Sequence, residues 1–305
     1  MTHKSNNNRV NVYQMVTDRI VAELEKGIIP WQKPWSGAGL ADGGAVNYVS
    51  RKPYSYLNQM LLGRSGEFLT FKQVKELGGS VKKGAESQVV VFYTKIKTTK
   101  KVTTPEGEEK EEEKLIPYLR YYRVFHLDDT TGIESKIKVD EAGEAQPENT
   151  LQPVEQAEAI VNGYISREDS PKFENNKPSD RAYYSPSLDK VVVPMLSQYQ
   201  EAEEYYSTTF HELVHSTMKK SRCDRTAENK MASFGSADYS REELVAELGS
   251  AMLSNLAGLD SAKAFKNSVA YIQSWLKALK NDNKMIVWAS GRAEKASKFI
   301  IGKEQ

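Results

Sequence analysis

Apolar residues recur at helical spacing near the start of the chain, within residues 10–26. Five of them lie three or four positions apart within residues 10–26: Val12, Met15, Val16, Ile20 and Leu24. Because one turn takes 3.6 residues, this pattern predicts a helix that ends at Gly27. A second helix is expected near 56–63, and Thr70 is expected to cap a short helix over 71–77.

The pattern changes to alternation in two later segments. Residues 87–97 alternate and are rich in β-branched side chains, and residues 118–127 have the same character. This period of two predicts a pair of strands. The strongly charged segment 98–114 lies between them, and we expect it to be a mobile hairpin tip.

The second half of the chain is predicted to be mostly helical. Segment 134–152 is polar and is expected to be a linker. One short strand is expected at 189–193, and residues 190–194 are a candidate for pairing with an extended peptide. Helices are expected at 153–165, 197–219, 240–256, 261–280 and 283–299. We therefore predict an α+β protein of two domains, 1–133 and 153–305.

Composition narrows the class of protein without indicating an activity. The single cysteine, Cys223, excludes an internal disulfide and a cysteine-cluster metal site, which is typical of a reducing compartment. The N-terminus lacks the apolar core of a secretory signal, and apolar runs such as 89–93 are far shorter than the ~20 residues of a membrane span. We therefore expect a soluble, cytoplasmic protein without a membrane partner.

The net charge of +1 hides an asymmetry between the two halves. Residues 1–125 carry 20 Lys and Arg against 13 Asp and Glu, a balance of +7, whereas the remainder carries 22 against 28, a balance of −6. This difference indicates two domains with different partners. A merely solvated charged surface is the alternative interpretation.

The strongest chemical motif is FHELVHS at residues 210–216. His211 and His215 are four residues apart, so on a helix both imidazoles lie on one face and reach one ion. Neutral imidazole suits Zn²⁺, and another divalent ion such as Mn²⁺ is the alternative. Glu212 is placed to act as the general base toward water at that ion. Two solvated histidines on a surface helix are the alternative.

A catalytic metal site needs a third protein ligand, and no histidine follows His215. The segment YSREELVAELGSAML, residues 239–253, carries Glu243 and Glu247 four residues apart. This spacing resembles the third-ligand helix of thermolysin-like metallopeptidases. There the first acid binds metal and the second hydrogen-bonds a ligand histidine. The resemblance implies Glu243 as the third ligand and Glu247 as the residue behind the site.

A helix cap is the competing interpretation of this third ligand. Ser240 and Glu243 have the spacing of a capping box, which would turn the glutamate back onto its own helix end. Glu242 would then be the alternative ligand.

The basic first half interleaves aromatic rings with cations, as in PWQKPW at residues 30–35. Single-stranded nucleic acid needs this mixture, because bases stack on rings and cations track phosphates. A loop anchored on a small core by its tryptophans is an equally good interpretation. The candidate DNA-binding residues are Trp31, Lys33, Trp35, Arg51, Lys52, Tyr54, Lys72, Lys82 and Lys83.

Taken together, the motifs resemble a known family. The segments VYQMVTDRIVAELEKGIIPWQKPW, LTFKQVKELGGSVKKG and YYRVFHLD look like the N-terminal single-stranded DNA-binding domain of ArdC-type antirestriction proteins. That domain is also similar to the N-terminal part of some plasmid primases. FHELVHS with YSREELVAELGSAML resembles the zincin-like metallopeptidase domain that follows it. Two features depart from the family: Ser216, Thr217 and Met218 replace its Trp-Thr-Gly, and the insert at 98–114 is longer.

The resemblance implies a protein of mobile genetic elements that shields conjugating DNA from restriction. It implies single-stranded DNA as one partner and a divalent metal held by His211, His215 and Glu243, with Glu212 as the catalytic base. A protein or peptide substrate is implied, but its identity is not. Two rival hypotheses remain: a DNA-binding protein with a structural metal site, and a metallopeptidase whose first domain binds protein.

Overall fold

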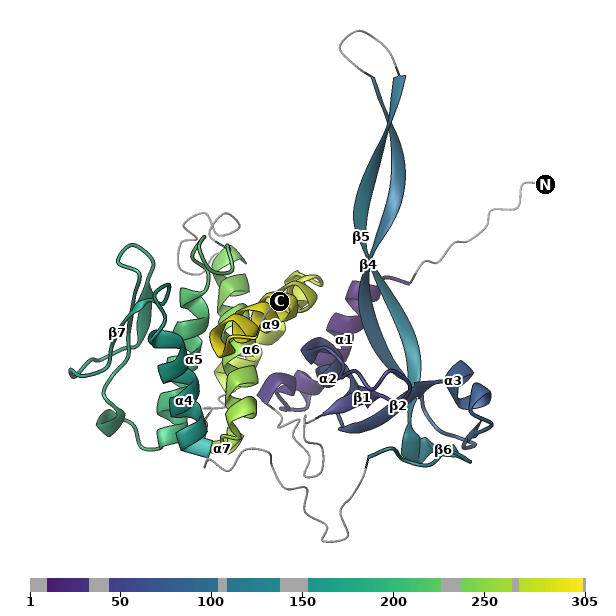
Figure 1. The fold of residues 1–305 in the computed structure, drawn as a ribbon, viewed down its shortest axis with the longest axis horizontal. Helices are drawn as coiled ribbons and strands as arrows, with labels where there is room; N and C mark the ends of the chain where they lie inside the picture. Colours follow the sequence, from purple (N-terminus) through teal and green to yellow (C-terminus); the bar gives the residue numbers. More distant parts are fainter. Residues whose placement is uncertain are drawn as a thin grey trace.

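The computed structural model of the chain contains two lobes packed side by side, with a long two-stranded ribbon projecting from one of them (Figure 1). None of the helices in the described segments is long and apolar enough to cross a membrane. The structure describes residues 10–32, 44–103, 109–137, 153–225, 237–264 and 269–303.

The N-terminal lobe is a four-stranded sheet with helices around it. The strand order is β1-β2-β5-β4, with β1 (Ala45–Asn47), β2 (Gly66–Thr70), β4 (Gln88–Thr103) and β5 (Glu109–His126). β1 and β2 are parallel, and the other pairs are antiparallel. The helical elements of this lobe are α1 (Val12–Glu25), η1 (Pro30–Gln32), α2 (Tyr56–Leu62), α3 (Phe71–Glu76) and η2 (Leu127–Asp129). A small ladder joins β3 (Ser80–Val81) to β6 (Thr130–Thr131).

Local signals account for the ends of these helices. The Thr70 hydroxyl accepts a hydrogen bond from the backbone N–H of Gln73, and the backbone N–H of Thr70 donates to the side-chain oxygen of Gln73, so the predicted cap is a full capping box. Gly27 has a φ of +78°, the left-handed conformation that ends a helix. The helices near 10–26, 56–63 and 71–77 therefore form as predicted, within one or two residues.

The predicted hairpin is longer than expected. Its ladder runs without a break from the pair Gln88–Val124 to the pair Thr103–Glu109. Segment 98–114 is therefore mostly strand rather than a mobile tip, and 104–108 lie outside the described residues. Thr98, Thr99, Val102 and Thr103 are β-branched and favour the extended backbone, which charge alone did not reveal.

The C-terminal lobe packs helices against a small mixed sheet. Its helices are α4 (Pro153–Ile165), α5 (Ala202–Ser216), α6 (Ala237–Ala257), α7 (Ser261–Ala264), α8 (Val269–Asn281) and α9 (Met285–Ile301), with a short η3 (Leu196–Gln198). The sheet order is β7-β9-β8, with β7 (Lys172–Glu174), β8 (Tyr183–Ser185) and β9 (Lys190–Val192). β9 is thus the middle strand. The idea that residues 190–194 pair with a peptide is wrong, because both edges of β9 are occupied.

The two lobes share one hydrophobic core. Ile20 and Trp31 of the first lobe belong to the same buried cluster as Trp275 and Leu279 of the second. Polar contacts reinforce the packing. Thr17 Oγ1 donates to Asn283 O at 2.8 Å, and Lys280 Nζ lies 2.7 Å from Glu25 Oε1. The predicted linker 134–152 lies outside the described residues from 138 onward.

Candidate metal centre

The metal centre is built where α5 packs against α6. Apolar side chains on one face of each helix are fully buried, among them Phe210, Leu213, Leu244 and Leu248. Gly249 lets the two helices approach closely, because a Cβ at this position would lie 2.7 Å from a methyl carbon of Val214. This close packing brings the histidine-bearing face of α5 within reach of side chains from α6.

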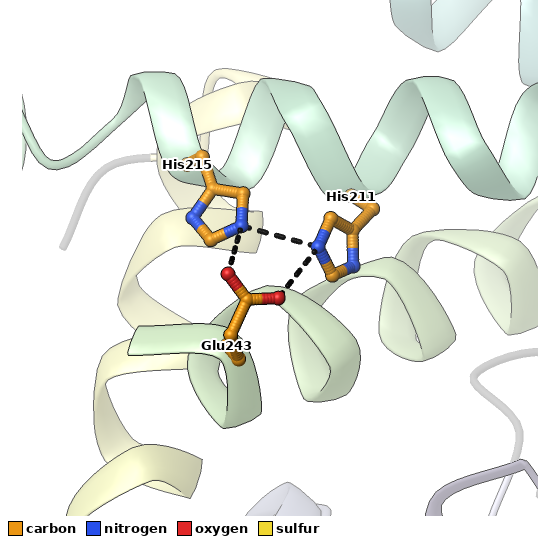
Figure 2. A group of neighbouring side chains, drawn as sticks. All are labelled: His211, His215 and Glu243. Atoms are coloured by element: carbon orange, nitrogen blue, oxygen red, sulfur yellow. Dashed lines mark hydrogen bonds and ion pairs between the residues drawn. The ribbon is translucent and has the colours of Figure 1, made fainter. Parts of the chain in front are cut away.

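Three predicted ligands converge at this interface (Figure 2). The Nε2 atoms of His211 and His215 lie 3.1 Å apart. The two carboxylate oxygens of Glu243 lie 3.5 Å from His211 Nε2 and 3.4 Å from His215 Nε2. One acid from α6 thus bridges two imidazoles from α5.

This group fits a divalent metal ion. Ligand bonds of about 2.0–2.2 Å at tetrahedral angles separate neighbouring ligand atoms by roughly 3.3–3.6 Å. The separations of 3.1, 3.4 and 3.5 Å are close to those edges. Two imidazole nitrogens and one carboxylate form a donor set that suits zinc and leaves a fourth position open. His211, His215 and Glu243 are therefore the residues that could hold an ion.

The capping-box alternative for Glu243 does not hold. Helix α6 begins at Ala237, so Ser240 is its fourth residue and not its cap. Glu242 is not a ligand in this arrangement either, because its Oε1 faces the Nδ1 atom of His215 at 3.5 Å. It therefore stands behind His215, on the side of the ring away from Glu243.

Arg225 holds Glu242 in place. Its Nε and Nη2 atoms donate to the two carboxylate oxygens of Glu242 at 3.0 and 2.6 Å. The same guanidinium donates to Val214 O at 3.0 Å and to Thr217 Oγ1 at 2.8 Å. These bonds orient the carboxylate toward His215, which in turn fixes the direction of the imidazole. The sequence alone does not indicate this arginine, because it lies past the end of α5 and has no motif spacing.

The predicted supporting acid, Glu247, is more loosely placed. Its Oε1 lies 3.9 Å from His211 Nδ1, which is too long for a hydrogen bond. Its other oxygen accepts a hydrogen bond from the Tyr271 hydroxyl of α8 at 2.9 Å. Glu212, the predicted base, is 9% exposed on α5.

The acids give the site a strong negative potential. Although burial opposes it, hydrogen bonding to Glu242 and Glu243 raises the pKa of His215 to about 10. Burial acts to raise the pKa of Glu243, but the hydrogen bonds with His211 and His215 outweigh it and lower this pKa. The first shift favours the protonated imidazole and the second favours the ionised carboxylate, so each side chain stabilises the charged form of the other. Because imidazole must be neutral to ligate, metal binding releases protons and weakens as the pH falls.

A cleft of about 250 Å³ opens beside His211. It is lined by residues from four helices, α5 to α8, and from the N-terminal lobe, including Glu204, Glu247, Tyr271 and Gln32. Both lobes therefore contribute to the cleft beside the candidate metal site.

The predicted DNA-binding residues do not form one surface. Trp31 is fully buried and meets Trp275 edge to face at 6.3 Å, and Tyr54 is 8% exposed and packs on Phe68. Neither ring is available to a base in this structure, which corrects the expectation for both. Lys33 and Trp35 lie outside the described residues.

The remaining predicted cations are exposed, but three of them already interact with other groups of the protein. Arg51 pairs with the buried Glu67, and Lys72 lies 3.6 Å from Glu76. Lys82 Nζ donates to the backbone of Asp128 at 2.6 Å. The exposed set is Arg51, Lys52, Lys72, Lys82 and Lys83.

The ribbon carries an aromatic face that the sequence analysis missed. Tyr118, Arg120 and Tyr122 alternate along β5 and so lie on one face, and the register places Phe92 opposite Arg120. The three rings are 45–46% exposed. Phe92 meets Tyr122 at 5.6 Å, and the Arg120 guanidinium lies 6.0 Å from the Tyr118 ring. The signal that could have found this face is the placement of Tyr118, Arg120 and Tyr122 at every second position of the predicted strand.

Comparison with known proteins follows the same two-part division. Residues 10–125 match the model of the N-terminal domain of anti-restriction factor ArdC, and residues 167–292 match that of a zincin-like metallopeptidase. The chain is 32% identical to the crystallised antirestriction ArdC protein from the R388 plasmid, over 96% of this chain and 98% of that one. The chain belongs to the ArdC antirestriction family. The predicted family and the α+β, two-domain fold class are thereby confirmed.

The ArdC relatives include a solved structure with a metal. The TM-score is 0.65 against the metal-free R388 ArdC structure and 0.66 against its Mn(II)-bound structure. Two Escherichia coli proteins described as DNA primase TraC are 29% and 28% identical over 96% of this chain. The chain spans only 27% and 20% of their lengths. An uncharacterized Sinorhizobium fredii (strain NBRC 101917 / NGR234) protein, y4eC, is 30% identical over 95% of this chain and 91% of its own length.

Proposed function

We propose that this ArdC-family chain is a cytoplasmic antirestriction protein of a mobile genetic element, with a metal-dependent peptidase centre and a surface for single-stranded DNA. The observation that carries the peptidase proposal is the convergence of His211, His215 and Glu243, with Glu212 directly beside the first histidine. The family membership supports the antirestriction role.

The donor set supports Zn²⁺ as the bound ion, with Mn²⁺ as the alternative that the related R388 structure suggests. A divalent ion held there would polarise a peptide carbonyl and make water more acidic. Glu212 takes the proton from the attacking water and passes it to the amine that leaves when the C–N bond breaks. The Arg225–Glu242 pair keeps His215 oriented during these steps.

A Glu212→Gln variant of the full chain tests the peptidase. The amide keeps the size of the side chain but cannot accept the proton, so we expect normal metal content and a loss of cleavage of at least ~100-fold. Casein and denatured host proteins serve as substrates, with Glu158→Gln on α4 as the matched control. Cleavage that is equal in the two variants would contradict the mechanism.

The aromatic face of the ribbon supports DNA binding. Phe92, Tyr118 and Tyr122 offer three exposed rings on which bases can stack, and Arg120 among them supplies a cation for the phosphates. The exposed lysines of the same lobe add charge that DNA would encounter at longer range. No sequence preference is expected, because stacking is available to every base.

Fluorescence anisotropy of labelled oligonucleotides with the full chain tests this surface. We expect single strands to bind more tightly than duplexes and binding to weaken as salt rises. Tyr118→Ala with Tyr122→Ala should lower the affinity at least ~10-fold, since each stacked base contributes about 1–3 kcal/mol. Tyr183→Ala, at an exposed tyrosine of the other lobe, is the control. Equal affinity in both variants would exclude the ribbon as the DNA surface.

Protection of transferred DNA distinguishes catalysis from a structural metal site. If the peptidase contributes, Glu212→Gln should lower conjugation into a restricting host while leaving transfer into a restriction-deficient host unchanged. Full protection by this variant would favour a DNA-coating protein whose metal is structural. Absence of any DNA binding would instead favour a peptidase whose first lobe recognises protein.

A further inference from the structure

Each of the two histidines has an acid on the side of its ring that faces away from Glu243. The Nδ1 atom of His215 lies 3.5 Å from Glu242 Oε1, and that of His211 lies 3.9 Å from Glu247 Oε1. A carboxylate beside the second ring nitrogen of a ligand histidine orients the imidazole and tunes the metal site. The support of these two acids therefore bears on how well the site holds an ion.

The two acids are held by different parts of the chain. Glu242 receives two bonds from Arg225, which follows α5 closely. Glu247 instead accepts a hydrogen bond at 2.9 Å from the hydroxyl of Tyr271 on α8. Burial and then the charge of Glu247 raise the pKa of Tyr271 well above its usual value, so this hydroxyl keeps its proton and donates.

Helix α8, which carries Tyr271, packs on the N-terminal lobe. Its main packing partner among the described elements is α1. The ring of Tyr271 meets that of Trp275, one turn further along α8, edge to face at 6.2 Å. Trp275 in turn meets the fully buried Trp31 of η1 at 6.3 Å. The place of the Tyr271 hydroxyl therefore depends on contacts that the first lobe supplies.

We infer that Tyr271 is a positioning residue of the metal centre and acts on His211 through Glu247. The N-terminal lobe fixes this tyrosine in turn, because Trp31 packs on Trp275 of the same helix. The inference rests on the proposed metal-dependent function and adds a route by which the first lobe supports that centre. The C-terminal lobe alone then does not complete the support of its own ligands.

The zinc affinity of the full chain, measured by competition with a chelating dye, tests the role of Tyr271 without requiring turnover. Tyr271→Phe removes only the hydroxyl and keeps the ring against Trp275. We expect the affinity to fall about 5–10-fold, because Glu247 loses the bond that holds it beside His211.

Tyr48→Phe is the matched control for this change. The Tyr48 hydroxyl is also buried and also donates one bond of 2.9 Å, but to Glu134 O within the N-terminal lobe. Its loss should leave the zinc affinity unchanged. Equal zinc affinities in the two variants would overturn the role of Tyr271.

A double substitution separates positioning through Glu247 from a general effect on packing. In a Glu247→Gln chain, adding Tyr271→Phe should cause no further fall in zinc affinity, because the two residues act as one unit. A further 5–10-fold fall would overturn this route. The visible absorption bands of Co²⁺ bound in place of zinc report the geometry of the ligands. They should change in Tyr271→Phe and stay as they are in Tyr48→Phe.

The link to the first lobe has a test of its own. Trp31→Phe keeps a ring in the buried site but reduces its contact with Trp275. It should weaken zinc binding about 3-fold in the otherwise unsubstituted chain and have no effect when Tyr271→Phe is already present. Melting temperatures are measured for every variant, and zinc binding is compared well below the lowest of them. Unchanged zinc affinity in Trp31→Phe would overturn the link.

The outcomes separate this inference from the function on which it rests. If the unsubstituted chain binds no zinc, the proposed metal centre fails and the inference fails with it. If Glu243→Gln abolishes zinc binding but Tyr271→Phe leaves it unchanged, the metal centre stands and the inference alone fails.

Discussion

A metal centre and a DNA-binding surface were both predicted from residue types. The structure brings the residues of the first together but buries the aromatic rings predicted for the second. At the metal centre, His211, His215 and Glu243 come together as their spacing indicated. In the aromatic half, Trp31 lies in the core shared by the two lobes. The exposed rings are on the ribbon instead, at Tyr118 and Tyr122.

The difference lies in what each prediction required. Two histidines four apart share a helix face whatever surrounds the helix, so their proximity is a local property. Whether a tryptophan stacks on a base or fills a core depends on which distant segment covers it. For Trp31 that segment is α8, more than two hundred residues further along the chain.

The largest expected effect would test the interpretation of Trp31 as a core residue. Trp31→Ala should lower the free energy of unfolding by about 3–5 kcal/mol, because it empties a fully buried site between the lobes. Urea denaturation measures this loss, and Trp288→Ala, at a partly buried ring, should cost less. If stability were unchanged and DNA binding were weakened, Trp31 would be a DNA-contacting residue and not a core residue.

The next test concerns the ligand set. Glu243→Gln should weaken zinc binding by more than about 100-fold, because it removes the charged ligand that both histidines face. Metal analysis after dialysis against a zinc buffer provides the measurement. Glu168→Gln, outside the site, is the matched control. Retention of one zinc per chain by the Glu243 variant would exclude this residue as a ligand.

A smaller effect is expected behind the ligands. Arg225→Met should weaken zinc binding by about 10–100-fold, because Glu242 would no longer be held against His215. Arg241→Met is the control, since that arginine pairs with Asp282 instead. Competition with a chelating dye gives both affinities. Equal values for the two variants would mean that the buried pair serves packing alone.

The smallest effect concerns the ion pairs that Asp189 makes with Lys219 and Arg222 just after α5, and it depends on pH. Burial acts to raise the pKa of Asp189, but hydrogen bonds from Arg222 and Lys219 outweigh it and lower this pKa to about 2. A carboxyl group with a lowered pKa in the folded chain stabilises above its unfolded pKa near 4, and this stability is lost as the pH falls toward 2. The contribution at neutral pH is about 2 kcal/mol.

Asp189→Asn tests this contribution, because asparagine tolerates the positive φ of 46° at this position. Urea denaturation at pH 7 should show the loss, and the difference from the unsubstituted chain should shrink at pH 3. A difference that is the same at both pH values would exclude the ionised carboxylate as its source.

Much of the architecture was predictable. The helix ends at Thr70 and Gly27 and the strand pairing at the base of the ribbon all follow from short-range signals. The length of the ribbon was not, because the charged segment masks its β-branched residues. The start of α6 was also not predictable, since Ser240 has the spacing of a cap but lies inside the helix.

By itself, the sequence determined the elements whose information is local: helix periodicity, caps, the HExxH spacing and the acids of α6. The tertiary structure alone decided which acid lies between the two histidines and which stands behind one of them, because that depends on the close packing of α5 on α6 at Gly249. It alone also placed Gln32 in the cleft of the other lobe. Burial and long-range contact are properties of the assembled core, and no single segment carries them.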